Sequence, residues 1–149
     1  MKKTVILLRH ADIDPPPGSA PDNWPLNAAG KARAKTLVHV VGSAGITAVF
    51  ASSAARTQKT AAPILTTLGL TLRVPAPAQL VSEVLSNGAG NVVLVVGHSN
   101  TVPATITALG ATFPGPPITA TGHDDLFVVT VHGPNTATAV RLKYGNRTP

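Results

Sequence analysis

Cysteine is absent from this chain of 149 residues, and aromatic residues make up only 3% of it. Without cysteine the chain has no disulfide, no thiolate metal site and no cysteine nucleophile, whatever compartment it works in. The scarcity of aromatic rings argues against the stacking platforms that bind single-stranded nucleic acid. These absences remove several classes of enzyme and binding protein from consideration.

Long hydrophobic runs are also missing, and no stretch approaches the ~20 apolar residues of a membrane span. The pair Lys2-Lys3 precedes an apolar run that is too short for the core of a signal peptide. We therefore expect a cytoplasmic protein with no membrane partner, although a leader already removed would leave no trace in the chain.

Hydrophobic residues form 44% of the chain, which is enough for one substantial core. The length predicts a single domain over residues 1–149. The oligomeric state is left open by the sequence.

Acidic residues are scarce, and the formal net charge is +6. The excess lies in residues 1–73, where nine Lys and Arg face three Asp. These basic residues are interleaved with Ala and Val and form no basic run, so we do not expect a nucleic-acid partner. Attraction of small anions toward a cleft explains the charge better.

Apolar runs alternate with helical patterns along the chain. Strands are predicted at residues 4–8, 47–51, 70–74, 92–96, 126–131 and 138–143, and helices at about 28–41, 54–68, 80–86 and 99–109. Asn27 and Ser53 are the expected N-caps, Gly69 is the expected terminator of the second helix, and Pro63 should kink or shorten that helix. This alternation predicts an α/β three-layer sandwich with a mostly parallel central sheet.

Polar residues follow three of the predicted strands. Arg9-His10 come after the first strand, Ser52-Ser53 after the second, and His98 after the strand at 92–96. In open α/β sheets, ligands bind beyond the carboxyl ends of the strands. We therefore expect these residues to meet at one edge of the sheet.

Two arginines and two histidines in one place favour phosphoryl chemistry. Arginine is well shaped to clamp a phosphoryl group, and histidine can act as a nucleophile or carry a proton. Arg56 stands in the first turn of its predicted helix, where the helix dipole disfavours a cation unless an anion binds there. The main-chain amides at the starts of the helices after Ser53 and His98 could donate to the same anion. Two neighbouring guanidinium groups should lower the pKa of His10.

The other histidines are weaker candidates in the sequence. We expect His39 to be exposed on a helix and His132 to lie in a turn, while His123 fits a solvated strand start better than a site residue. No HxH or HExxH spacing occurs, so neither a metal nor another cofactor is expected. Ser99 lacks the G-x-S-x-G frame of a serine hydrolase.

Four sequence segments carry a resemblance to a known family. They are Leu8-Arg9-His10-Ala11, Leu26-Asn27-Ala28-Ala29-Gly30 with Ala34, Ser52-Ser53-Ala54-Ala55-Arg56-Thr57 with Thr60-Ala61, and Gly97-His98-Ser99-Asn100. In these residues and their order, the chain resembles the histidine phosphatase superfamily, which has the phosphoglycerate mutase-like fold.

The resemblance implies catalysis by His10, Arg9, Arg56 and His98. His10 would attack phosphorus and become transiently phosphorylated, while the other three hold the phosphoryl oxygens, and Asp12 and Ser99 would also contact the substrate. No metal would be needed, because positioning and charge stabilisation carry most of phosphoryl transfer.

The proton donor for the leaving group is open in the sequence. Larger members of the family carry an acid between the positions that Arg56 and His98 match, and Glu83 is the only acid in that interval, although it fits a surface residue better. Asp12 is comparable to an acid in small members that resemble phosphohistidine phosphatases.

Because the chain is short, we expect only two loops, at residues 12–25 and 114–121, to form the walls of the site. An open site suits a small phosphatase acting on a phosphorylated small molecule or a phosphoprotein better than a mutase, which must exclude water. The alternatives are a non-catalytic module that binds phosphate or phosphopeptide and, less favoured, a phosphoglycerate mutase-type phosphotransferase.

Overall fold

One six-stranded sheet forms the centre of the computed structural model, which describes residues 2–14 and 21–149. Its strands are β1 (Lys3–Arg9), β2 (Ala48–Ala51), β3 (Leu72–Arg73), β4 (Val92–Gly97), β5 (Asp125–Gly133) and β6 (Thr136–Lys143). Their order across the sheet is β3-β2-β4-β1-β5-β6. The first four strands of this order are parallel, whereas β5 and β6 are antiparallel to their neighbours.

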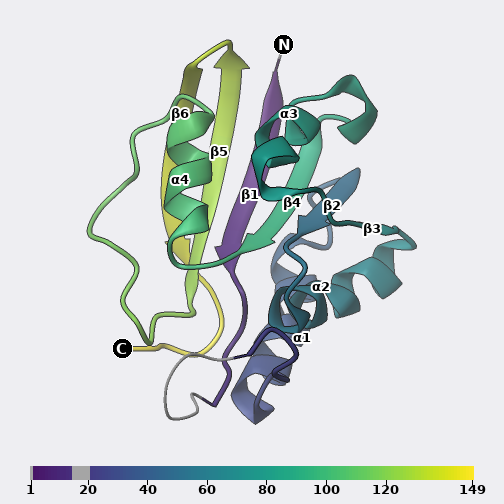
Figure 1. The fold of residues 1–149 in the computed structure, drawn as a ribbon, viewed down its shortest axis with the longest axis vertical. Helices are drawn as coiled ribbons and strands as arrows, with labels where there is room; N and C mark the ends of the chain where they lie inside the picture. Colours follow the sequence, from purple (N-terminus) through teal and green to yellow (C-terminus); the bar gives the residue numbers. More distant parts are fainter. Residues whose placement is uncertain (1, 15–20) are drawn as a thin grey trace.

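Helices cover both faces of the sheet (Figure 1). They are α1 (Ala28–Val41), α2 (Ala55–Leu68), α3 (Leu80–Val84) and α4 (Thr101–Ala108), with short 3-10 turns at Pro77–Gln79 and Asn87–Ala89. α1 and α2 share one apolar core with the sheet, and α3 and α4 share the other. The expected α/β sandwich with a mostly parallel sheet is confirmed.

The apolar runs of β1 and β4 follow from their central position. Val5 and Leu7 point into the core beneath α4, while Ile6 and Leu8 point into the core beneath α1 and α2. β1 pairs with β4 on one side and β5 on the other, so its side chains are buried on both faces of the sheet. The sequence of a strand in this position is hydrophobic throughout and does not alternate between apolar and polar residues.

The caps of α1 and α2 only partly match the sequence prediction. The side chain of Asn27 accepts a hydrogen bond of 2.8 Å from the Gly30 amide, as expected of an N-cap. The prediction for Ser53 was wrong, because Ala54 is the N-cap of α2 and makes no side-chain bond. Gly69 ends α2 in the left-handed conformation, with φ of 67°. α2 continues through Pro63 to Leu68, so this proline does not shorten it as one alternative foresaw.

Several boundaries also differ from the prediction. α3 is confined to Leu80–Val84 and preceded by the 3-10 turn, and α4 begins only at Thr101. β5 continues to Gly133, so His132 lies in that strand rather than in a turn. Residues 114–121 contain no helix or strand, as predicted, whereas part of the predicted loop at 12–25, residues 15–20, lies outside the described residues.

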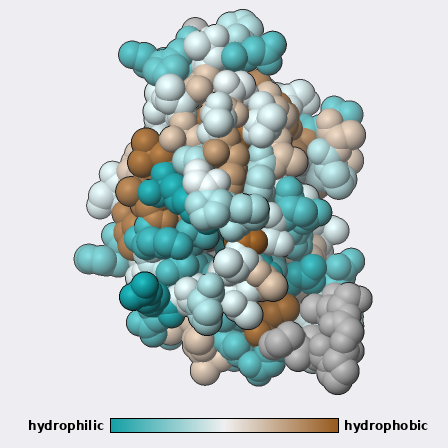
Figure 2. Space-filling view, turned by 90° about the vertical axis from the view of Figure 1, so that its left-hand side faces the viewer, coloured by the Kyte–Doolittle hydropathy of each residue, from teal (hydrophilic) through white to brown (hydrophobic). Residues whose placement is uncertain are grey.

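The strand β6 forms one edge of the sheet. Figure 2 shows the molecule from the left-hand side of Figure 1, where brown residues form small separate groups on a mostly teal and white surface. Val140 and Leu142 are exposed on β6. Within residues 2–14 and 21–149, no helix has the length and apolar character needed to cross a membrane.

Candidate active site

The carboxyl ends of β1, β2 and β4 bring the predicted site residues together. Arg9 pairs with Gly97 in register, and the His10 amide donates a hydrogen bond of 2.8 Å to the Gly97 carbonyl. Ser52 and His98 follow the neighbouring strand ends and are joined by a hydrogen bond of 2.8 Å. The parallel pairing therefore places His10, Ser52 and His98 at one edge of the sheet, as the strand pattern predicted.

His10 lies deep in this edge, with 3% of its surface exposed. Its Nδ1 lies 2.9 Å from the carbonyl oxygen of Ala11. A carbonyl only accepts hydrogen bonds, so Nδ1 carries the proton and Nε2 keeps a free lone pair. Burial lowers the pKa of His10 to about 3, and repulsion from Arg9 adds to this effect, while the Ala11 carbonyl opposes it. The expected lowering is present, but burial and not arginine charge is its main cause.

His98 lies against His10, with ring centroids 5.5 Å apart and planes at 64°. Its Nε2 bonds to the Ser52 hydroxyl, which in turn lies 2.8 Å from the Thr57 hydroxyl. The pKa of His98 is lowered by burial and then by the charges of Arg56 and Arg9. The side chain of His98 is thus oriented from β2 and α2 and is kept neutral.

Arg9 combines fixed and unsatisfied donors. Its Nη1 donates to the carbonyls of Thr119, Ala120 and Gly122 at 3.3, 3.0 and 2.8 Å. Its Nε is buried and has no hydrogen-bond partner among the described residues. Burial lowers the pKa of Arg9, and repulsion from Arg56 lowers it further. A bound anion would provide both the missing acceptor and the missing negative charge.

Arg56 is the second residue of α2, and the charge of its side chain is only weakly matched. Its Nη1 lies 3.9 Å from a carboxylate oxygen of Asp22 and 3.4 Å from the Pro21 carbonyl. Asp22 itself is largely exposed, so this ion pair is weak. Arg56 and Arg9 both act on the pKa of His98. The two arginines thus place positive charge beside the neutral His98, whose ring lies against that of His10.

The main-chain amides expected to assist anion binding are partly occupied. The Ala55 amide donates to the Asp22 carbonyl at 2.6 Å, and the Ala54 amide lies 3.4 Å from the Ser52 hydroxyl. The His98 amide donates to the Thr101 hydroxyl at 2.9 Å. Side chains rather than these three amides are therefore the free donors of the site.

His123 belongs to the site, although the sequence favoured a solvated strand start for it. It is 8% exposed, its Nδ1 donates a hydrogen bond of 3.0 Å to the His10 carbonyl, and its ring centroid lies 5.4 Å from that of His10. The prediction failed because it ignored strand direction. β5 runs antiparallel to β1, with Leu126 opposite Leu8, so the residues before β5 lie beside the end of β1.

Asp12 lies near His10 in the chain but forms an ion pair with Arg33. Its carboxylate accepts hydrogen bonds of 2.7 and 3.4 Å from Nε and Nη2 of Arg33. Burial alone would raise the pKa of Asp12, but Arg33 outweighs it and the pKa is lowered. A Cβ at Gly30 would collide with the Asp12 carbonyl oxygen, which explains the glycine in the first turn of α1. A carboxylate held in this way has no proton to give near neutral pH.

Glu83 is not brought to this edge. It is exposed on α3, and Lys3 donates a hydrogen bond of 2.7 Å to the carbonyl of Ser86, just after that helix. α3 therefore lies beside the amino end of β1, whereas His10 follows its carboxyl end. The seven residues of β1 separate the two positions by about 20 Å.

Ser99 lies in the turn between β4 and α4, directly after His98, and is half-buried. Its position fits the rim of the site. Among residues 2–14 and 21–149, no group of three or more His, Asp or Glu side chains is arranged to hold a metal ion.

The family model described as Histidine phosphatase superfamily (branch 1) matches residues 5–76. No curated protein sequence matches the chain.

Solved structures share the fold over 94% or more of this chain. The protein histidine phosphatase SixA complexed with tungstate is 18% identical, with a TM-score of 0.70, over 94% of this chain and 96% of that one. A structure from Nakamurella multipartitia, whose assignment as phosphohistidine phosphatase SixA is itself provisional, is 22% identical, with a TM-score of 0.65, over 98% and 96%. A mycobacterial glucosyl-3-phosphoglycerate phosphatase is 15% identical, with a TM-score of 0.68, over 97% and 99%.

Proposed function

We propose that this chain, which the histidine phosphatase superfamily model matches over residues 5–76, is a metal-independent phosphatase of that superfamily. It hydrolyses a phosphomonoester or a phosphohistidine through a covalent intermediate on His10. The observation that carries this proposal is the state of that histidine, whose Nδ1 is bonded to Ala11 and whose pKa is lowered to about 3. Its Nε2 is therefore an unprotonated nucleophile at neutral pH.

The reaction needs two displacements at phosphorus. In the first, the lone pair of His10 Nε2 forms a P–N bond while the bond from phosphorus to the leaving group breaks. In the second, water forms a P–O bond, the P–N bond breaks, and phosphate leaves with His10 restored. Arg9, Arg56 and His98 hold the phosphoryl oxygens and balance their charge in both steps. The buried Nε of Arg9, which has no hydrogen-bond partner in the described part of the chain, supports this role.

The leaving group needs a proton, and neither of the two acids that the sequence suggested, Asp12 and Glu83, is placed to supply it. Arg33 keeps Asp12 ionised, and Glu83 lies at the far end of β1. We therefore propose that Asp12 orients the loop after β1 and that Ser99 contacts the substrate at the rim. Substrates with good leaving groups, including phosphohistidine, depend less on an acid than alkyl esters do.

The solved structures with this fold have names that cover both substrate classes, since one is a protein histidine phosphatase and another a glucosyl-3-phosphoglycerate phosphatase. For the present chain we propose a phosphorylated small molecule or a phosphoprotein as substrate and the cytoplasm as its place of action. We also propose that residues 1–149 act as one domain.

The test is phosphate release by the purified protein from a phosphohistidine substrate and an alkyl phosphomonoester, measured side by side. His10→Ala should abolish release from both, whereas His39→Ala, which changes an exposed histidine of α1, should leave it intact. Preference for phosphohistidine would show that a strong proton donor is dispensable. If the protein binds phosphate but releases none from either substrate, the enzyme proposal fails and the non-catalytic binding module takes its place.

A further inference from the structure

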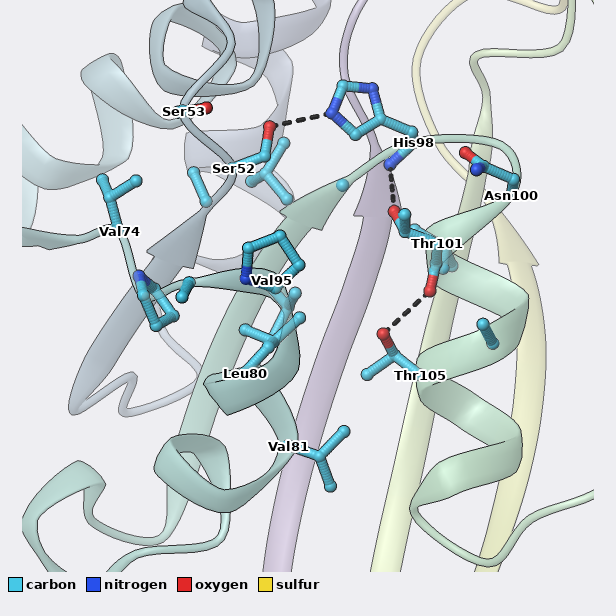
Figure 3. Close-up of a pocket in the computed structure, with 18 residues that line it drawn as sticks. Ser52, Ser53, Val74, Leu80, Val81, Val95, His98, Asn100, Thr101 and Thr105 are labelled. Carbon is cyan, nitrogen blue, oxygen red and sulfur yellow. Dashed lines mark hydrogen bonds between the residues drawn. The ribbon is translucent and has the colours of Figure 1, made fainter.

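A pocket of about 560 Å³ extends from the candidate active site along the face of β4 (Figure 3). It lies between α4 on one side and the segment from Val74 through α3 on the other. Val95 of β4 lies against it, Leu80 and Val81 of α3 line one wall, and Thr105 of α4 lies on the opposite wall. The volume falls within the range typical of small-molecule sites.

Apolar groups dominate the lining of this pocket. Among the described residues, none of those that line it is Asp, Glu, Lys or Arg. The Thr105 hydroxyl donates to the Thr101 carbonyl at 2.8 Å, and the Thr101 hydroxyl accepts from the His98 amide. These two hydroxyl groups already have partners in the protein. The other polar side chains of the lining, Ser52, Ser53, His98 and Asn100, follow the carboxyl ends of β2 and β4.

The pocket is continuous with the proposed phosphate site. Ser52 and His98, which are hydrogen-bonded to each other, lie at the pocket end near the carboxyl edge of the sheet (Figure 3). His98 also contacts the His10 ring at a centroid distance of 5.5 Å. A molecule whose phosphoryl group lies beside His10 and His98 can therefore place another part of itself in the pocket.

The pocket also communicates with solvent. Val74 at its rim is 44% exposed, and Ala104 on α4 lines it while remaining exposed. When an apolar ligand covers apolar surface that was exposed to water, the free energy of the complex falls. Charge around His10 and apolar character a few residues away match a molecule with a phosphate at one end and a hydrocarbon group at the other.

We propose that this pocket binds the apolar part of the substrate, so that the protein prefers phosphomonoesters carrying an aryl or similarly bulky hydrocarbon group over small polar ones. The inference rests on the proposed function for the position of the phosphoryl group. It goes beyond that function by assigning a second subsite and a class of leaving group.

Binding of phosphonates tests the pocket without any turnover. Calorimetry would compare 1-naphthylphosphonate with methylphosphonate, and the naphthyl compound should bind at least about tenfold more tightly. Ala104→Trp, which fills the pocket, should remove most of this difference. Ala108→Trp is the matched control, because Ala108 is an exposed alanine of the same helix that does not line the pocket.

A second pair of variants guards against a folding defect in the tryptophan variant. Val74→Asp places a charge at the rim and should weaken naphthylphosphonate binding more than methylphosphonate binding. Val140→Asp changes a valine on β6 that is 55% exposed and should alter neither. Equal affinity of the wild-type protein for the two phosphonates would overturn the proposal, as would a preference for the naphthyl compound that survives both Ala104→Trp and Val74→Asp.

Kinetics then separates this proposal from the proposed function. The wild-type protein should hydrolyse 1-naphthyl phosphate with a higher kcat/KM than phenyl phosphate, and Ala104→Trp should reduce that ratio. If no phosphate is released from either ester while naphthylphosphonate binds preferentially, the phosphatase proposal fails and the apolar subsite stands. If both esters are hydrolysed equally well and the phosphonates bind equally, the subsite fails and the phosphatase proposal stands.

Discussion

His123 Nδ1 donates a hydrogen bond of 3.0 Å to the main-chain carbonyl of His10. The donor comes from the segment before β5, and the acceptor follows β1, so the bond joins residues far apart in the sequence. Its acceptor carbonyl belongs to the proposed nucleophile itself. We infer that His123 is a positioning residue that fixes the backbone from which the His10 ring projects.

Replacing His123 should show this effect. His123→Phe keeps a ring of similar size but leaves the buried carbonyl of His10 without a donor, which should lower the free energy of unfolding by about 1–3 kcal/mol. If His10 is displaced, kcat should fall more than KM rises, measured on an aryl phosphate. His123→Asn restores a donor and should recover part of kcat. If the Phe variant loses stability but keeps its kcat, His123 has only a structural role and the inference is wrong.

The buried histidines should also make the protein sensitive to acid. Burial lowers the pKa of His10, His98 and His123, so their folded-state values lie below the unfolded value of about 6.5. Below that pH the unfolded chain binds more protons than the folded one, so stability falls as pH decreases toward the folded-state pKa, about 3 for His10. Stability from these groups is fully present only above about pH 6.5.

Melting temperature measured from pH 7.5 to pH 4.5 should therefore decline. The decline should be shallower in His123→Asn, which removes one of the three imidazoles whose pKa is lowered. It should be unchanged in His39→Asn, which alters an exposed histidine. A flat profile in the wild-type protein would contradict the account. Activity should persist below pH 6 as long as the fold does, because His10 stays neutral there.

The pair formed by Asp12 and Arg33 should matter more for stability than for chemistry. Arg33 also donates to the carbonyls of Tyr144 and Asn146 at 2.8 Å, so it ties α1 to both the loop after β1 and the end of the chain. Arg33→Met would leave a carboxylate buried without its partner, and the free energy of unfolding in urea should fall by about 3–5 kcal/mol.

Lys31→Met, an exposed change on the same helix, should shift the unfolding free energy by less than about 0.5 kcal/mol. The combination of Asp12→Asn with Arg33→Met should cost less than the two single changes added together, since it removes both members of the pair. Strict additivity would show that the ion pair contributes little and that the loss comes from the main-chain bonds.

The order of strands and helices was determined largely by the local sequence. A strand buried on both faces must be apolar throughout, and a helix must repeat its apolar positions every three to four residues, so both leave a pattern that can be read without the fold. Residues that directly follow strands could be assigned to one sheet edge for the same reason. Arg9, His10 and His98 became candidate site residues in this way, and Arg56 did so through its unusual place in a first helical turn.

Tertiary structure alone decided the remaining features, because they depend on which distant segments become neighbours. The antiparallel pairing of β5 with β1 brings His123 to His10, and the packing of α1 brings Arg33 to Asp12 and removes Asp12 from consideration as an acid. The pocket between α3 and α4 likewise arises from the spacing of two helices on one face of the sheet. Local patterns report whether a residue is buried, whereas the identity of its neighbour is set by the register and direction of elements far along the chain.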